Sequence, residues 1–195
     1  MSSISPQISA SSALSMRERL IVALDVSTSR EALELVRRIG DAAGIYKIGL
    51  QLFTAAGPDL VRDLVQSGRQ VFLDLKLHDI PNTVGHAVSS AVELGANMLT
   101  VHGSGGSAML RAASEAAGGH VTLLAVTVLT SMDEEALHEI GVPASVADKA
   151  LHIATLARNV GLRGVVTSPR EAGALRRVLG DAFTIVTPGV RPAGA

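Results

Sequence analysis

Two aspartates and a lysine lie close together in residues 72–83, which read Phe-Leu-Asp-Leu-Lys-Leu-His-Asp-Ile-Pro-Asn-Thr. The charged residues are Asp74, Lys76 and Asp79. Because side chains alternate between the two faces of a strand, Asp74 and Lys76 are expected on one face with Phe72, and the leucines on the other. Partly buried charges are unfavourable by several kcal/mol unless they are paired, so this pattern indicates a site of chemistry.

A second lysine, Lys47, ends the preceding apolar run in the same way. Two lysines placed among two aspartates compensate one another in a pocket of low polarity. An ammonium held between carboxylates stays protonated and can donate a proton, while a nearby carboxylate repels an anionic group of a substrate. The alternative is a salt-bridged strand end that faces water.

Polar residues also follow the first and fifth apolar runs. Asp25 ends the first run, and Thr28 with Glu31 has the spacing of a capping box. Thr28 is therefore expected to cap the following helix, which leaves Asp25 for a ligand. Thr130 and Ser131 follow the fifth run, where they could bind a ligand or cap a helix.

A candidate phosphate-binding loop follows the seventh apolar run at residues 187–192, Thr-Pro-Gly-Val-Arg-Pro. The loops after the last two strands of a (β/α)8 barrel often bind phosphate through backbone N–H groups and a cation. Gly189 permits close approach of the backbone, and Arg191 supplies a bidentate donor. An exposed Pro-Gly turn is the alternative.

These residues must be positioned by alternating strands and helices. Strands are expected at 20–24, 45–50, 71–75, 98–102, 121–128, 164–167 and 183–187, with helical apolar spacing between them and an inserted loop at 131–143. The first five units recur about every 25 residues, which predicts right-handed βα units and a parallel sheet. A doubly wound sheet and a (β/α)8 barrel both fit this pattern. The regular alternation and the polar strand ends favour the barrel.

The length of 195 residues suits one domain. We expect residues 1–16 to form a disordered serine-rich tail, or to precede a true start at Met16, and residues 17–195 to form the barrel domain. Because such a barrel takes about 250 residues, we expect its eighth strand and last helix to be missing from this chain.

Composition excludes several classes of function. The net charge is −1 with acids and bases interspersed, which argues against a nucleic-acid or membrane partner. There is no cysteine, and the six histidines lack the spacing of a helical zinc pair. No apolar run approaches the roughly 20 residues of a membrane span, and the N-terminus does not resemble a signal peptide. We therefore expect a cytoplasmic protein.

From about Arg19 to Arg191 the sequence resembles the bacterial stand-alone orotidine 5′-phosphate decarboxylases. The most specific match is the segment 72–83, and supporting matches are 23–25, 46–49, 126–131 and 187–192. The resemblance implies conversion of orotidine 5′-phosphate to uridine 5′-phosphate and CO2 in pyrimidine biosynthesis. It implies a homodimer that needs neither a metal nor an organic cofactor.

The resemblance also implies roles for the charged residues. Lys47, Asp74, Lys76 and Asp79 would form a charged tetrad, with Asp79 contributed to the site of the neighbouring subunit. Lys76 would donate the proton to C6 of the pyrimidine, and Asp74 would crowd the departing carboxylate. Lys47 and Asp79 would also contact ribose hydroxyls.

The remaining implied contacts surround the substrate. Asp25 and Thr83 would hold ribose hydroxyls, and Ile80 would line the pocket. Thr130 would contact the pyrimidine, and Arg191 the phosphate. Whether Thr130 or Ser131 makes the pyrimidine contact stays open.

Two alternatives remain. Magnesium-dependent sugar-phosphate decarboxylases and aldolases of the same barrel group share the Asp-x-Lys-x-x-Asp motif but place an acidic metal ligand on strand two, where this chain has Lys47. Alternatively, the chain is an inactive fragment of the decarboxylase, because an absent eighth strand would leave two strand edges unpaired.

Overall fold

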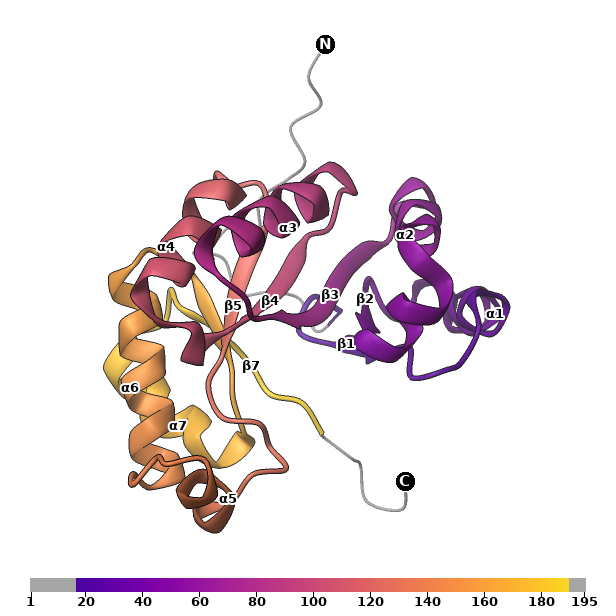
Figure 1. Cartoon of the computed structure of the whole chain (residues 1–195). Coiled ribbons are helices and arrows are strands. Elements are labelled where there is room, and N and C mark those ends of the chain that lie inside the picture. The colour runs from indigo at the N-terminus through magenta and orange to yellow at the C-terminus, as the bar shows by residue number, and fades with distance from the viewer. Residues whose placement is uncertain (1–16, 190–195) are drawn as a thin grey trace.

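The computed structural model describes residues 17–189, and Figure 1 shows a curled parallel sheet with helices around its outside. The seven strands are β1 (Ile21–Ala23), β2 (Ile45–Gly49), β3 (Gln70–Leu77), β4 (Met98–His102), β5 (Thr122–Val126), β6 (Gly164–Val166) and β7 (Thr184–Val186). Each strand pairs in parallel with the next one in the chain. The order never reverses, so the doubly wound alternative is wrong and the predicted parallel α/β sheet is confirmed.

The helices connect successive strands. They are α1 (Ser29–Ile39), α2 (Leu50–Gln66), α3 (Pro81–Glu93), α4 (Gly106–Ala117), α5 (Glu134–Glu139), α6 (Val146–Asn159) and α7 (Pro169–Leu179), with short 3-10 turns at Gly40–Ala42 and Gly103–Gly105. Thr28 and Glu31 form the predicted capping box of α1. The short helix α5 lies in the predicted insertion. No helix in the described residues is long and apolar enough to cross a membrane.

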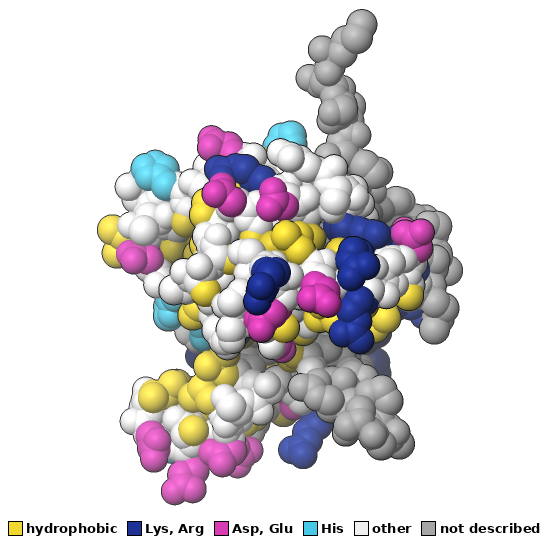
Figure 2. Space-filling model, turned by 90° about the vertical axis from the view of Figure 1, so that its right-hand side faces the viewer, with side chains coloured by type: hydrophobic (Ala, Val, Ile, Leu, Met, Phe, Trp, Pro, Cys, Tyr) yellow, Lys and Arg dark blue, Asp and Glu magenta, His cyan; other side chains and the backbone are white. Residues whose placement is uncertain are grey.

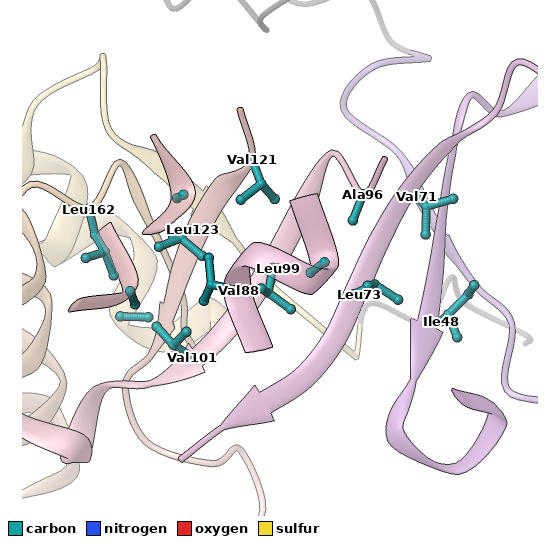
Figure 3. Packing of buried hydrophobic residues seen from close by; sticks show 14 of the residues in the cluster. Ile48, Val71, Leu73, Val88, Ala96, Leu99, Val101, Val121, Leu123 and Leu162 are labelled. Atoms are coloured by element: carbon teal, nitrogen blue, oxygen red, sulfur yellow. The ribbon is translucent and has the colours of Figure 1, made fainter. Parts of the chain in front are cut away.

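The main core lies between the sheet and the helices. Alternate strand residues such as Ile48, Leu73, Leu99 and Leu123 point toward the helices and meet side chains such as Val88 of α3 (Figure 3). Burying one such side chain contributes about 1.5–3 kcal/mol, so this layer is the main source of stability. On the outer face that carries α1 and α2, acidic and basic side chains are interspersed (Figure 2).

The opposite, concave face of the sheet holds a second apolar layer to which every strand contributes one residue. Its members are Ile21, Ile45, Phe72, Met98, Leu124, Val166 and Val186. Two residues further along their strands, Lys47, Asp74 and Thr100 follow on the same face. The apolar layer therefore forms a floor beneath these polar side chains.

Strand β3 confirms the predicted division of its side chains and corrects its length. Leu75 and Leu77 pack against the outer core, whereas Phe72 belongs to the inner layer. The strand runs to Leu77 rather than Leu75, and its pairing with β4 shifts register after Leu73. Strands β1 and β5 are shorter than predicted, at Ile21–Ala23 and Thr122–Val126. The predicted tail at 1–16 lies outside the described residues.

Candidate active site

Lys76 and Asp74 form an ion pair on the concave face. The Lys76 ammonium donates to Oδ2 of Asp74 at 2.9 Å. The Asp74 side chain is 16% exposed and that of Lys76 is 37% exposed. A pair this little hydrated interacts more strongly than a surface pair, because water screens the charges less. The sequence correctly placed these two side chains together.

Thr100 of β4 completes this pair, and the sequence analysis did not single it out. Its hydroxyl donates to Oδ1 of Asp74 at 3.0 Å and accepts the backbone N–H of Lys76 at 2.8 Å. Thr100 is fully buried. The available signal was a lone hydroxyl in the middle of the apolar strand 98–102, since buried polar groups are retained where they are hydrogen-bonded.

A second ion pair lies beside the first. The Lys47 ammonium is 2.9 Å from Oδ1 of Asp25, with Lys47 20% exposed and Asp25 68% exposed. Gly49 pairs with Asp74 in the sheet, and a Cβ placed on Gly49 would lie 3.2 Å from the Lys47 ammonium. The ammonium therefore lies over Gly49, next to the position of Asp74.

Asp79, Ile80 and Thr83 follow β3 and are exposed. Asp79 accepts the backbone N–H of Ile80 through Oδ1 at 2.6 Å. Within residues 17–189, Asp79 forms no ion pair, so a single subunit does not bring it to either lysine. Ile80 is 65% exposed, and Thr83 lies in the first turn of α3.

Thr130 and Ser131 are exposed in the loop after β5. The next helix, α5, is capped by Asp133, whose carboxylate accepts the N–H of Ala136 at 2.9 Å. The helix-cap alternative for Thr130 and Ser131 is therefore wrong. Arg191 lies outside the described residues.

Two histidines lie beside the Lys76 segment. The rings of His78 and His102 stack with centroids 5.0 Å apart. Nδ1 of His102 accepts the N–H of Ser104 at 3.3 Å. Burial, with smaller contributions from His78 and from the positive charge of Lys76, lowers the pKa of His102 below its ordinary value. A neutral imidazole is therefore favoured at this edge of the site.

No group of three or more His, Cys, Asp or Glu side chains in residues 17–189 is arranged to hold a metal ion. Within the described residues, the site contains two ammonium groups, each beside a carboxylate. Such an arrangement can donate protons and can stabilise developing negative charge.

Comparisons with known proteins give a consistent result. The model of the orotidine 5′-phosphate decarboxylase / HUMPS family matches residues 18–195. A protein of Nitrosococcus oceani named orotidine 5′-phosphate decarboxylase is 49% identical, covering 92% of this chain and 78% of its own length. A protein of the same name from Syntrophotalea carbinolica is 51% identical, covering 92% and 77%. The crystal structure of orotidine 5′-phosphate decarboxylase from Lactobacillus acidophilus is similar with a TM-score of 0.82 and 38% identity, over 89% of this chain and 82% of that one.

Proposed function

This chain belongs to the orotidine 5′-phosphate decarboxylase / HUMPS family, and we propose that it converts orotidine 5′-phosphate to uridine 5′-phosphate and CO2 in pyrimidine biosynthesis. Relatives about half identical to this chain carry that enzyme's name. The observation that carries the proposal is the Lys76 ammonium held 2.9 Å from the poorly hydrated carboxylate of Asp74.

The proposed reaction breaks the bond between C6 of the pyrimidine and its carboxylate. Asp74 lies beside the substrate carboxylate and repels it, and this repulsion disappears as neutral CO2 departs. The electron pair stays on C6, where the Lys76 ammonium stabilises it and then supplies the proton. Only interactions that strengthen toward the transition state raise the rate, and a preorganised ammonium beside C6 meets that condition.

The substrate is held by groups around this pair. In the proposal, Lys47 and Asp25 bind ribose hydroxyls, together with Thr83 and with Asp79 of a second subunit. Ile80 lines the pocket, and Thr130 or Ser131 contacts the pyrimidine. Arg191 binds the phosphate.

We propose that the functional unit is a homodimer. Asp79 has no cationic partner among the described residues of its own chain, and Ile80 beside it is 65% exposed. A second subunit placed over this segment would cover the isoleucine and accept the carboxylate into its own site. This arrangement gives the two-fold interface expected of most homo-oligomers.

We also propose that the seven strands form most of a (β/α)8 barrel. One further strand, paired with both β7 and β1, would close it. Their sequential parallel order, the shared apolar floor and the similarity to the Lactobacillus acidophilus enzyme support this. In such a barrel the catalytic groups lie at the carboxyl ends of the strands. Asp74 and Lys76 lie in the second half of β3, and Lys47 lies at the middle of β2 rather than at its end.

The magnesium-dependent sugar-phosphate reaction is the second candidate, because the Asp-x-Lys-x-x-Asp motif at residues 74–79 resembles that of the enzymes that catalyse it. Lys47 argues against it. Lys47 lies on β2, and its positive charge would repel a divalent cation. Its ammonium also forms an ion pair with Asp25, whose carboxylate is therefore not available as a metal ligand. The proposal therefore includes no metal and no organic cofactor.

The test is an assay of the 195-residue chain with orotidine 5′-phosphate, with and without EDTA, followed by ultraviolet absorbance. We expect uridine 5′-phosphate to form at the same rate in both conditions. Turnover of a hexulose phosphate that requires magnesium, without turnover of orotidine 5′-phosphate, would overturn the proposal. Absence of both reactions in a folded chain would support the inactive-fragment alternative.

A further inference from the structure

We propose that Thr100 is a positioning residue that sets both the backbone of Lys76 and the carboxylate orientation of Asp74. Its catalytic consequence rests on the decarboxylase function proposed above, whereas its structural consequence can be measured without activity. Thr100 belongs to none of the groups placed around the substrate. It reaches the reaction only through the two residues that it contacts.

The pairing between β3 and β4 is irregular near Thr100. The pairing of β3 with β4 skips from Leu73 to Leu77 on β3, while it advances by only two residues on β4. Three residues of β3, among them Asp74 and Lys76, therefore lie opposite the single residue Thr100. A bulge of this kind bends the strand and re-aims side chains, and it interrupts the regular backbone hydrogen bonds.

The backbone of Lys76 has an unusual conformation within this irregular segment. Its φ angle is +50°, and it is the only residue other than glycine with a positive φ in residues 17–189. L-residues adopt this conformation at a cost, so the surroundings must hold it in place. The Thr100 hydroxyl accepts the Lys76 N–H at 2.8 Å and so replaces the ladder bond that the bulge removes.

The two hydrogen bonds of the Thr100 hydroxyl determine the direction of its proton. A threonine hydroxyl has one proton, and because its oxygen already accepts from the Lys76 backbone, the proton points to Oδ1 of Asp74 at 3.0 Å. Oδ2 is then left for the Lys76 ammonium at 2.9 Å. Both carboxylate oxygens are occupied, so one buried hydroxyl fixes the plane of the carboxylate and the direction of the ammonium.

Positioning of this kind predicts a specific kinetic effect. Thr100→Val keeps the branched shape but removes both hydrogen bonds, and we expect kcat to fall roughly 100-fold with KM changed much less. Thr100→Ser keeps the hydroxyl and should stay near the wild-type kcat. Restoration by serine separates loss of the hydroxyl from a general packing defect.

A matched control is available just after the neighbouring strand β5. Thr127 follows β5, is also buried, and its hydroxyl bonds to the carbonyl of Val166 and to Thr167. Thr127→Val removes a buried hydroxyl without touching Asp74 or Lys76. It should lower the melting temperature about as much as Thr100→Val, with a smaller effect on kcat.

The role of Thr100 can also be tested without an activity assay, through the NMR signals of the lysine side chains. The chain has only three, at positions 47, 76 and 149. With 13C at their ε carbons, the NMR signal of each can be assigned by arginine substitution. In Thr100→Val we expect the Lys76 signal to move and its backbone amide to exchange faster with solvent, while the Lys149 signal stays in place.

The outcomes separate this inference from the proposed function. If the wild-type chain has no decarboxylase activity, the NMR and exchange measurements still test Thr100. If Thr100→Val fails to fold, Thr100→Cys, which is similar in size but a weak hydrogen-bonding partner, takes its place. An unchanged Lys76 signal and amide, or a kcat within about twofold of wild type, would overturn the inference.

Discussion

The ammonium of Lys47 and the carboxylate of Asp25 lie 2.9 Å apart, although 22 residues separate them in the sequence. The register of the sheet brings them together, because Ala23 pairs with Lys47 and Asp25 follows two residues later. The Asp74–Lys76 pair lies on the next strand. The site thus consists of two neighbouring ion pairs, and loss of any one charge leaves its partner uncompensated.

Replacing Lys76 should remove catalysis without unfolding the protein. In Lys76→Ala we expect kcat to fall about 1,000-fold, because no other group at this place can protonate C6. Its loss leaves the carboxylate of Asp74, which is 16% exposed, without a cation, so the melting temperature should fall while the chain stays folded. Steady-state kinetics and circular dichroism check both points, with Lys149→Ala on α6 as the control. Turnover close to that of the control would show that the assigned role is wrong.

Replacing Asp25 should weaken substrate binding more than stability. In Asp25→Asn, the substrate loses a hydrogen bond to a charged group, worth about 1.5–3 kcal/mol, so KM should rise roughly 10- to 100-fold. The Asp25 side chain is 68% exposed, which keeps the effect on folding small. Asp59→Asn, in an exposed pair with Arg62 on α2, is the matched control. Equal KM values for the two variants would contradict the prediction.

A methyl group at Gly49 should displace the Lys47 ammonium. The added Cβ would lie 3.2 Å from that nitrogen, so Gly49→Ala is expected to impair activity about tenfold or more while the chain stays folded. Gly173→Ala is the control, since nothing lies within 4 Å of its added Cβ. Because Gly173 lies within α7, alanine there should stabilise the protein by about 0.5–1 kcal/mol. Kinetics and thermal unfolding of both variants measure the contrast.

Sharing of Asp79 between subunits can be tested by mixing two inactive variants. A hybrid of Lys76→Ala and Asp79→Ala chains has one site with both substitutions and one site with neither. After subunit exchange at equal amounts, we expect roughly a quarter of the wild-type activity, because half of the dimers are hybrids with one intact site. Sedimentation velocity checks that the chains are dimers. Failure of the mixture to recover activity would place Asp79 in its own subunit's site.

The stability of the fold should depend on the protonation of His102. Burial, and then His78 and Lys76, lower the pKa of His102 from its ordinary value of 6.5. The unfolded chain therefore binds this proton at a higher pH than the folded chain. The stabilising contribution is present above pH 6.5 and is lost as the pH falls below it.

Thermal unfolding measured from pH 8 to pH 5 tests this contribution. In His102→Asn, which retains an acceptor for the N–H of Ser104, the loss of melting temperature at acid pH should be smaller than in the wild type. His152→Asn, exposed on α6, should follow the wild type. If His102→Asn loses as much melting temperature at acid pH as the wild type does, His102 does not contribute to the pH dependence of stability.

The sequence determined the features that depend on local periodicity and spacing. Alternation of apolar runs and helices gave seven parallel strands, and the two-residue period of β3 placed Asp74 and Lys76 on the concave face. The capping box at Thr28 could also be predicted from the sequence, because its two partners are three residues apart. The contribution of Asp79 to a second subunit and the phosphate contact of Arg191 stay predictions.

Only the tertiary structure decided which polar groups meet across strands. The Asp25–Lys47 contact depends on the register of β1 and β2, and the contacts of Thr100 depend on a bulge that gives Lys76 a positive φ. Register and bulges are set by how the two apolar layers of the whole sheet pack. A local pattern contains no information on which residue of the next strand a given side chain will face, and for that reason Thr100 was missed.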